Sequence, residues 1–250
     1  MLKLSFREAN MLRYLALLAA LILGFGAQSA NAQTTGAAQP SVTAIDIALE
    51  PDATMLQHAS ALNARLRQSF PKGYALDASH RPHVTMLQRY VRTADLPKVY
   101  AAVANIMTAK NPATWKFQAF KIDHAVWSGL ALTVILAKPP QDVLEAQQQL
   151  IDAIAPYTVA TGSAAAFDTT AAEPDINAST MTYVTEFVPK STGKNYIAHV
   201  TCGVASVAFV KTLEAQPFTP FTFSPAAVSV YQLGNFGTAR KKLKEWRLTP

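Results

Sequence analysis

Two kinds of hydrophobic pattern alternate along this chain, and this alternation restricts its fold more than any other feature of the sequence. Apolar residues alternate with polar ones over 43–50, and they recur at three- and four-residue steps over 53–70. The first pattern is typical of a half-buried strand, and the second of an amphipathic helix. Because the same alternation continues toward the C-terminus, the sequence predicts an α+β fold.

Turn-forming residues mark the ends of these elements. Pro51-Asp52 ends the first strand and can cap the first helix, Pro71-Lys72-Gly73 ends that helix, and Ser128-Gly129 indicates a hairpin turn. The segment 158–175 is rich in alanine, threonine, glycine and aspartate, so we expect an irregular loop there. The other expected strands cover 81–91, 115–127, 130–137, 196–204, 221–233 and 236–248, and the other expected helices cover 93–111, 140–157, 177–188 and 206–215.

The N-terminus resembles an export signal. The basic residues Lys3, Arg7 and Arg13 lie near the start of the chain, and an apolar run follows over 15–27. Ala30-Asn31-Ala32 then gives the pattern that a signal peptidase cleaves. An apolar run of this length is shorter than the roughly 20 residues that cross a bilayer. We therefore predict a signal peptide over 1–32, with cleavage after Ala32 and a periplasmic or secreted product without a stable membrane anchor. An uncleaved anchor is the alternative, and Met11 is a possible second start.

The rest of the chain is expected to form a flexible linker over 33–42 and one domain over 43–250. Its two similar halves, about 43–139 and 140–250, predict two intertwined lobes. A chain of this length can bury a sizeable core without covalent cross-links. Cys202 is the single cysteine, so an internal disulfide is excluded. It lies in an apolar strand pattern, which favours a core position over a nucleophile.

The charge balance favours a small phosphorylated ligand over a long nucleic acid. The full chain has a formal net charge of +6, and the first 32 residues hold three of the basic side chains and one of the acidic ones. The remaining charge of +4 is modest, whereas proteins that grip a nucleic acid along its backbone carry dense basic clusters. We therefore expect no binding of long nucleic acid.

Two segments with the same central residues carry the chemistry. Arg81-Pro82-His83-Val84-Thr85 and Ile197-Ala198-His199-Val200-Thr201 each place His-Val-Thr in an expected strand, one in each half of the chain. Because side chains two residues apart in a strand share a face, each segment presents an imidazole and a hydroxyl to one surface. A third match to the pattern, His58-Ala59-Ser60, lies within a helix and is attributed to chance. The alternative for each motif taken alone is a histidine satisfied within the core.

The two motifs resemble those of the 2H phosphoesterase superfamily, which includes 2′-5′ RNA ligase-like proteins and cyclic nucleotide phosphodiesterases. The resemblance covers 44–248 in element order and rests on the two motifs at residue level. It implies two pseudo-symmetric lobes, each a mainly antiparallel sheet with helices on its outer face, around a central cleft. It also implies that His83 and His199 are catalytic and that Thr85 and Thr201 hold the phosphate. Many members have proline before both histidines; Pro82 fits this pattern and Ala198 departs from it.

The expected activity is hydrolysis of a cyclic (2′,3′-type) or 2′-5′ phosphodiester in a nucleotide or an RNA end. One histidine would act as general base and the other as general acid, since imidazole titrates near neutral pH. This chemistry needs no metal or other cofactor. The sequence leaves open which histidine is the acid. A non-catalytic binding protein with the same cleft and a metal hydrolase are the alternatives, and 2′-5′ ligation is less favoured because of export. We expect a monomer.

The candidates for substrate contacts depend on position alone. Tyr90, Tyr231 and Phe236 could stack on a base, although core packing is the alternative for each. Lys194 and Tyr196 precede the second motif and could approach the phosphate. His80 and His83 could form a metal pair, but no carboxylate or cysteine with ligand spacing accompanies them. His124 is expected to be structural.

Overall fold

The computed structural model describes residues 41–127, 129–171 and 173–249. The predicted signal peptide and most of the predicted linker lie outside the described residues. The first strand begins at Val42, within one residue of the expected start of the domain. No helix within the described ranges is long and apolar enough to cross a membrane.

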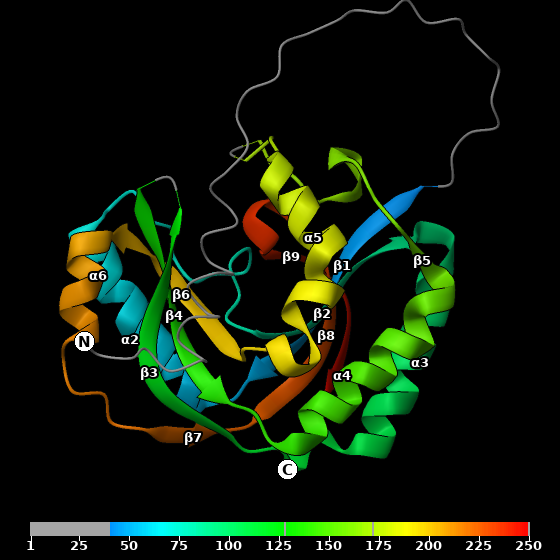
Figure 1. The fold of residues 1–250 in the computed structure, drawn as a ribbon, viewed down its shortest axis with the longest axis horizontal. Coiled ribbons are helices and arrows are strands. Elements are labelled where there is room, and N and C mark those ends of the chain that lie inside the picture. Colours follow the sequence, from blue (N-terminus) through cyan, green and yellow to red (C-terminus); the bar gives the residue numbers. More distant parts are fainter. Residues whose placement is uncertain (1–40, 128, 172, 250) are drawn as a thin grey trace, which may run out of the picture.

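The described chain forms two antiparallel sheets (Figure 1), which confirms the predicted α+β fold. In the first sheet the strand order is β5-β2-β1-β8-β9, and in the second it is β6-β4-β3-β7. The first sheet consists of β1 (Val42–Pro51), β2 (Val84–Arg92), β5 (Thr158–Val159), β8 (Pro225–Leu233) and β9 (Ala239–Arg247). The second consists of β3 (Phe117–Trp127), β4 (Leu130–Lys138), β6 (His199–Ser206) and β7 (Phe221–Phe223).

Four of the helices in the described ranges cover the outer faces of the sheets. Figure 1 shows α3 (Leu96–Lys110) and α4 (Gln141–Ile154) along the flank of the first sheet, and α2 (Ala53–Ser69) and α6 (Val207–Glu214) along the flank of the second. Their apolar stripes join the inward residues of both sheets in one core, because burying those stripes together removes the most apolar surface from water.

The fifth helix, α5 (Ala178–Ser191), lies on the other face of the first sheet. Ile45 and Ile47 of β1 belong to the main core, whereas their neighbour Ala44 belongs to a second cluster with Tyr90 and with Val184 of α5. Adjacent residues of a strand point to opposite faces, so the two clusters lie on the two sides of this sheet. The face opposite α3 and α4 is therefore covered at one end by α5.

Each sheet takes strands from both halves of the chain. β1 and β2 join β5, β8 and β9, while β3 and β4 join β6 and β7. The lobes thus interleave along the sequence. One predicted strand, 221–233, is wrong as a single element, because the chain changes sheets within it: β7 pairs with β3, and β8 pairs with β1. The break is at Ser224, whose backbone exchanges two 2.8 Å hydrogen bonds with Asp52, at its amide and its side-chain Oδ2.

The segment 158–175, predicted as an irregular loop, contains a short strand. Thr158 and Val159 form β5 and pair with Val91 and Tyr90 at the edge of the first sheet. A strand of two residues is too short to show a period in the sequence, so the pattern could not reveal it.

A polar side chain joins α2 to the second sheet. Asn63 Nδ2 donates to Cys202 O at 2.8 Å and to Tyr74 O at 3.0 Å. Cys202 itself is fully buried, and burial raises the pKa of its thiol to about 12. A thiol in this environment stays protonated, as expected for a core residue.

The next residue, Gly203, has φ of 150° where α2 approaches β6. A Cβ there would lie 2.9 Å from Asn63 Nδ2 and 3.0 Å from Leu66 Cδ1. Residues other than glycine rarely adopt this backbone conformation, and the space for a methyl group is already filled.

Replacing this glycine tests the packing of α2 on the second sheet. We expect Gly203→Ala to lower the free energy of unfolding by about 2–4 kcal/mol, measured by urea denaturation. Gly193→Ala is the control, since Gly193 also has positive φ (57°) but has no atom within 4 Å of the added Cβ. Its expected cost is about 1 kcal/mol of backbone strain. Equal costs for the two variants would contradict the proposed close contact.

Candidate active site

The two His-Val-Thr motifs lie at equivalent places in the two sheets. His83 directly precedes β2, and His199 is the first residue of β6, so both strands begin three residues later than the sequence predicts. Val84 and Val200 are buried in the main core, while both histidines are partly exposed. This alternation confirms that histidine and threonine share the face opposite the core.

A β-bulge follows each motif. Thr85 pairs with Ala48 and Leu87 with the adjacent Ile47, so Met86 is the extra residue. Thr201 likewise pairs with Val134 and Gly203 with Thr133, so Cys202 is the extra residue. The bulge falls at the residue after the threonine in both sheets. Bulges of this kind re-aim the side chains beside them, and here they give the two motifs the same local frame.

The histidines are also anchored in the same way. His83 Nδ1 lies 2.7 Å from Arg81 O, and His199 Nδ1 lies 2.8 Å from Ile197 O, in each case the carbonyl two residues earlier. A carbonyl only accepts, so Nδ1 carries the proton in both rings. In the neutral form of each ring the lone pair is then on Nε2, the nitrogen farther from the backbone.

The two motifs are brought together in space. β2 and β6 are in contact, and the Tyr196 hydroxyl, next to the second motif, donates to Thr85 O of the first at 2.9 Å. Burial is the main cause that lowers the pKa of His199, and His83 lies close enough for its charge to lower this pKa as well. Tyr196 thus contributes a link between the sheets, and its hydroxyl is engaged with the backbone.

The sequence analysis missed Asp46, a fully buried carboxylate of β1. Its Oδ2 accepts from Thr85 Oγ1 at 2.8 Å and from Gln88 Nε2 at 3.3 Å, and it lies 3.3 Å from His83 Nε2. Its Oδ1 is buried without a hydrogen-bond partner in the described part of the chain. One signal was available: Asp46 is an ionisable residue between Ile45 and Ile47 in the middle of a strand, where a buried charge requires partners.

The environments of the two histidines move their pKa values in opposite directions. Burial disfavours a charged His83, but the contact with Asp46 outweighs burial and raises the pKa of His83 above its usual value. Burial lowers the pKa of His199, the hydrogen bond to Ile197 O opposes that shift in part, and the net pKa lies below the usual value.

The two threonines differ as well. The Thr85 hydroxyl donates to Asp46, whereas the Thr201 hydroxyl makes no hydrogen bond to another described residue. Thr201 lies on the same face of β6 as His199 and is partly exposed. Of the two predicted phosphate-holding hydroxyls, Thr201 is therefore the one free to donate to a ligand.

A second carboxylate, Glu50, lies on the same face of β1 as Asp46, because side chains an even number of residues apart in a strand share a face. It accepts from the hydroxyls of Ser229 and Tyr231 and lies 2.6 Å from Lys242 Nζ. Burial raises the pKa of Glu50, but these partners together hold it below its usual value. Because it is paired with Lys242, Glu50 adds little net charge to the site.

A groove of about 300 Å³ adjoins the first motif. Arg81 and Pro82 contribute to its wall directly before His83, and Glu50 contributes from β1. Its other lining residues are Pro51, Leu56, Ser60, Leu76 and Asp77. This volume is at the lower end of the range for small-molecule sites.

The structure places the remaining predicted contact residues in different surroundings. Tyr231 lies in the site, with its ring centre 6.5 Å from that of His83, but it is fully buried and its hydroxyl is held by Glu50. Tyr90 is 1 % exposed and packs edge-on against Phe167, so its predicted role in base stacking is not supported and its core alternative fits. A buried ring leaves no face for a base.

Phe236 and Lys194 are at the surface. Phe236 is 53 % exposed and packs edge-on against Trp127 of β3, with ring centres 4.0 Å apart. Lys194 is exposed in a short 3₁₀ turn (Gly193–Asn195) and forms no ion pair with another described residue. Neither side chain forms a hydrogen bond, an ion pair or a ring contact with His83 or His199 within the described residues.

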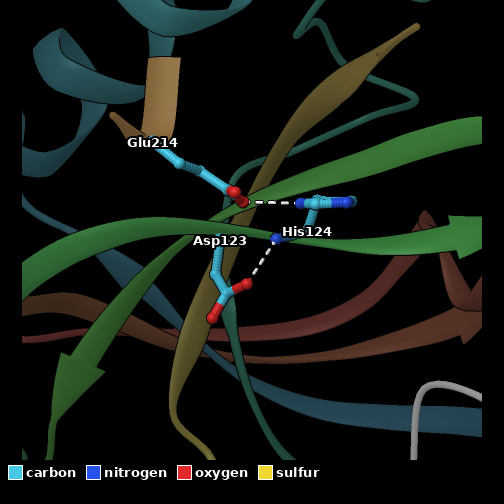
Figure 2. A group of neighbouring side chains, drawn as sticks. All are labelled: Asp123, His124 and Glu214. Carbon is cyan, nitrogen blue, oxygen red and sulfur yellow. Dashed lines mark hydrogen bonds and ion pairs between the residues drawn. The ribbon is translucent and has the colours of Figure 1, made fainter. Parts of the chain in front are cut away.

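Figure 2 shows a separate cluster of possible metal ligands: Asp123, His124 and Glu214. Their nearest ligand atoms lie within 4.8 Å of one another. His124 Nδ1 is 2.5 Å from Glu214 Oε1, however, and Lys121 Nζ is 2.9 Å from Asp123 Oδ2. Glu214 thus pairs with His124 and Asp123 pairs with Lys121, and the structural role expected for His124 stays a prediction.

His80 does not join His83 in a metal site. Its ring stacks on Tyr74, with centres 4.4 Å apart, and its nitrogens face Asp77 and Glu173. Neither His80 nor His83 belongs to a cluster of three ligand atoms within the described ranges.

Comparison with known proteins gives no assignment. No protein-family model matches the chain, and no curated protein matches it significantly.

Proposed function

We propose that this protein hydrolyses a cyclic (2′,3′-type) or 2′-5′ phosphodiester in a nucleotide or RNA end, as the 2H phosphoesterase superfamily does. One observation carries the proposal. Two histidines from different sheets share one frame, in which Nδ1 is bonded to the carbonyl two residues earlier and a threonine is followed by a bulge. Two unrelated core histidines would not be expected to share both the same Nδ1 hydrogen bond and the same bulge on strands that are in contact.

This arrangement suits displacement at phosphorus. The neutral imidazole removes a proton from water, and the water oxygen forms a bond to phosphorus. The bond from phosphorus to the ribose oxygen breaks, and the charged imidazole gives its proton to that oxygen. The Thr201 hydroxyl donates to a non-bridging oxygen, where negative charge increases in the transition state.

The surroundings favour a small substrate. The groove of about 300 Å³ beside His83 can hold one nucleoside-sized group, with the apolar side chains of Leu56 and Leu76 against a base and Arg81 near the phosphate. The modest positive charge of the chain attracts a phosphate without the dense basic surface that a long nucleic acid requires.

The alternative is a protein that binds the same ligands without turnover. In the described structure His83 Nε2 and the Thr85 hydroxyl both face Asp46, which leaves fewer free donors than a symmetrical site would have. Binding without turnover predicts retention of a 2′,3′-cyclic mononucleotide in unchanged form, so the product analysis below distinguishes the two.

The first test of the activity removes each histidine in turn. We expect the purified protein to open a 2′,3′-cyclic mononucleotide in the presence of a chelator, and we expect His83→Ala and His199→Ala each to lower kcat/KM by about 10²–10⁴. The loss follows because each variant lacks one of the two proton-transfer groups. The measurement is chromatographic separation of cyclic and opened nucleotide.

His58→Ala is the matched control, because His58 lies in a His-x-Ser sequence on α2 and stacks on Phe221. It should retain the activity of the unchanged protein. Full turnover in either motif variant would contradict the assigned roles, and binding without any product would favour the alternative. Loss of activity in chelator that zinc restores would indicate a metal hydrolase.

The two threonines provide a second test. We expect Thr201→Val to lower kcat/KM by about 100-fold with little change in the urea midpoint, because its hydroxyl serves only the transition state. Thr85→Val should instead lower the free energy of unfolding by about 1.5–3 kcal/mol, because it removes a donor from the buried carboxylate of Asp46. Equal effects of the two variants on stability would contradict the difference seen in the site.

A further inference from the structure

The two motifs have the same frame but unequal neighbours. Asp46 lies on β1, two residues before Ala48, the partner of Thr85. In the second sheet the partner of Thr201 is Val134, and the residue two positions before it on β4 is Leu132. The register position that holds a carboxylate in the first sheet therefore holds an apolar side chain in the second.

We propose that Asp46 is a positioning residue that makes His83 the general acid and His199 the general base. This inference rests on the proposed function and goes beyond it, because it assigns a direction to the proton transfers. It depends on which atoms face each ring.

His83 has an acceptor at both nitrogens. Nδ1 faces Arg81 O at 2.7 Å, and Nε2 faces the Asp46 carboxylate at 3.3 Å. A neutral imidazole carries one proton and would direct a lone pair at one of these oxygens, whereas imidazolium carries a proton at each nitrogen. The site thus favours a charged His83. The raised pKa of this ring agrees with that geometry.

His199 has an acceptor at one nitrogen. Nδ1 faces Ile197 O at 2.8 Å, and no described residue forms a hydrogen bond with Nε2. Burial disfavours a charged His199, and a charged His83 disfavours it further. The more distant charge of Asp46 opposes these effects only in part, so the pKa of His199 is lowered. His199 therefore presents a lone pair at Nε2, which a general base requires.

Other charged groups around the rings do not reverse this assignment. From β1, Glu50 favours a charged His83 but is paired with Lys242 of β9. The tyrosines that adjoin the site are Tyr231 of β8, Tyr183 of α5 and Tyr196 before β6, and burial raises the pKa of each of them, so all three are neutral near pH 7. Arg81, before β2, is the nearest cation in sequence and lines the groove.

The proton path follows from this assignment. His199 Nε2 takes a proton from the attacking water, and His83 Nε2 gives its proton to the leaving ribose oxygen. The separation of 3.3 Å between His83 Nε2 and Asp46 Oδ2 exceeds the usual 2.9–3.0 Å, so the proton is not confined to a short bond with the carboxylate. Bulk water then returns a proton to His83 and takes one from His199.

The direct test is a pH titration of both imidazoles by NMR in the substrate-free protein, with assignment from the two histidine-to-alanine variants. We expect His83 to remain protonated to a higher pH than His199. In Asp46→Asn the His83 transition should move to lower pH by about one unit or more, because an amide can donate to neutral Nε2 and carries no charge. Coincident transitions of the two rings in the unchanged protein would overturn the inference without any variant.

The matched kinetic measurement is the pH profile of kcat/KM. Activity requires neutral His199 and charged His83, so the alkaline limb reports His83. Asp46→Asn should move that limb to lower pH and reduce activity at pH 8 about tenfold or more relative to pH 6. Glu214→Gln is the control, since it removes one carboxylate beside a histidine outside the site, and its profile should keep its shape.

The outcomes separate the inference from the proposed function. A cyclic nucleotide that is bound but never opened, together with separated imidazole transitions, would reject the function and keep the electrostatic role of Asp46. Normal turnover with an unmoved alkaline limb in folded Asp46→Asn would reject the role of Asp46 and keep the function. A circular dichroism spectrum and urea midpoint show whether the variant is folded.

Discussion

The site depends on one fully buried carboxylate. Desolvating an ion costs several kcal/mol in a protein, so Asp46 is tolerated only because donors surround its Oδ2. These donors are Thr85, Gln88 and His83, and all three belong to β2 or to the residue before it. A register slip of one residue would turn them to the other face and leave the charge unpaired. The requirement to satisfy Asp46 therefore fixes the register of β1 and β2 as well as the place of His83.

The second constraint is the relative position of the two sheets, because each sheet carries one of the two motifs. Tyr196 donates to the backbone of Thr85 across the junction, and Asn63 holds α2 against the backbone of β6 beside the second motif. Both bonds end on main-chain carbonyls, so they position the strands themselves. Packing of α2 behind β6 and of α3 and α4 behind the first sheet then supports the histidines from their apolar sides. Both histidines thus lie at the beginning of strands that are packed against this core, which holds their positions.

The sequence predicted the elements that depend on local pattern, and it failed where the answer depends on pairing. The period of α2, the cap at Asp52 and the shared face of histidine and threonine are local, and the structure confirms them. The first strand was expected to be half-buried, but β1 is buried on both faces because side chains pack on both sides of its sheet. The change of sheet at Ser224 is invisible to a period-two pattern, because both β7 and β8 alternate. Asp46 was missed for a related reason: its partners lie about 40 residues away and meet it only through the register of β1 and β2. Tyr90 was predicted as a possible stacking residue because the pattern of its own strand does not show which face is covered. In the fold, α5 covers the face of the sheet on which Tyr90 lies.

The most informative feature is a departure from symmetry. Two identical motifs in identical frames would give two histidines with the same proton affinity. A single proton would then be shared equally between the rings, and only one of the two arrangements would suit a displacement that needs a defined acid and a defined base. The bulges, the Nδ1 anchors and the threonines are duplicated, but the position occupied by Asp46 in one sheet is occupied by Leu132 in the other. Asp46 lies 3.3 Å from His83 Nε2 and forms no such pair with His199, so it favours a charged ring more strongly at the first motif than at the second. In the proposed mechanism the repeated frame supplies the two imidazoles, and the unrepeated carboxylate makes them different.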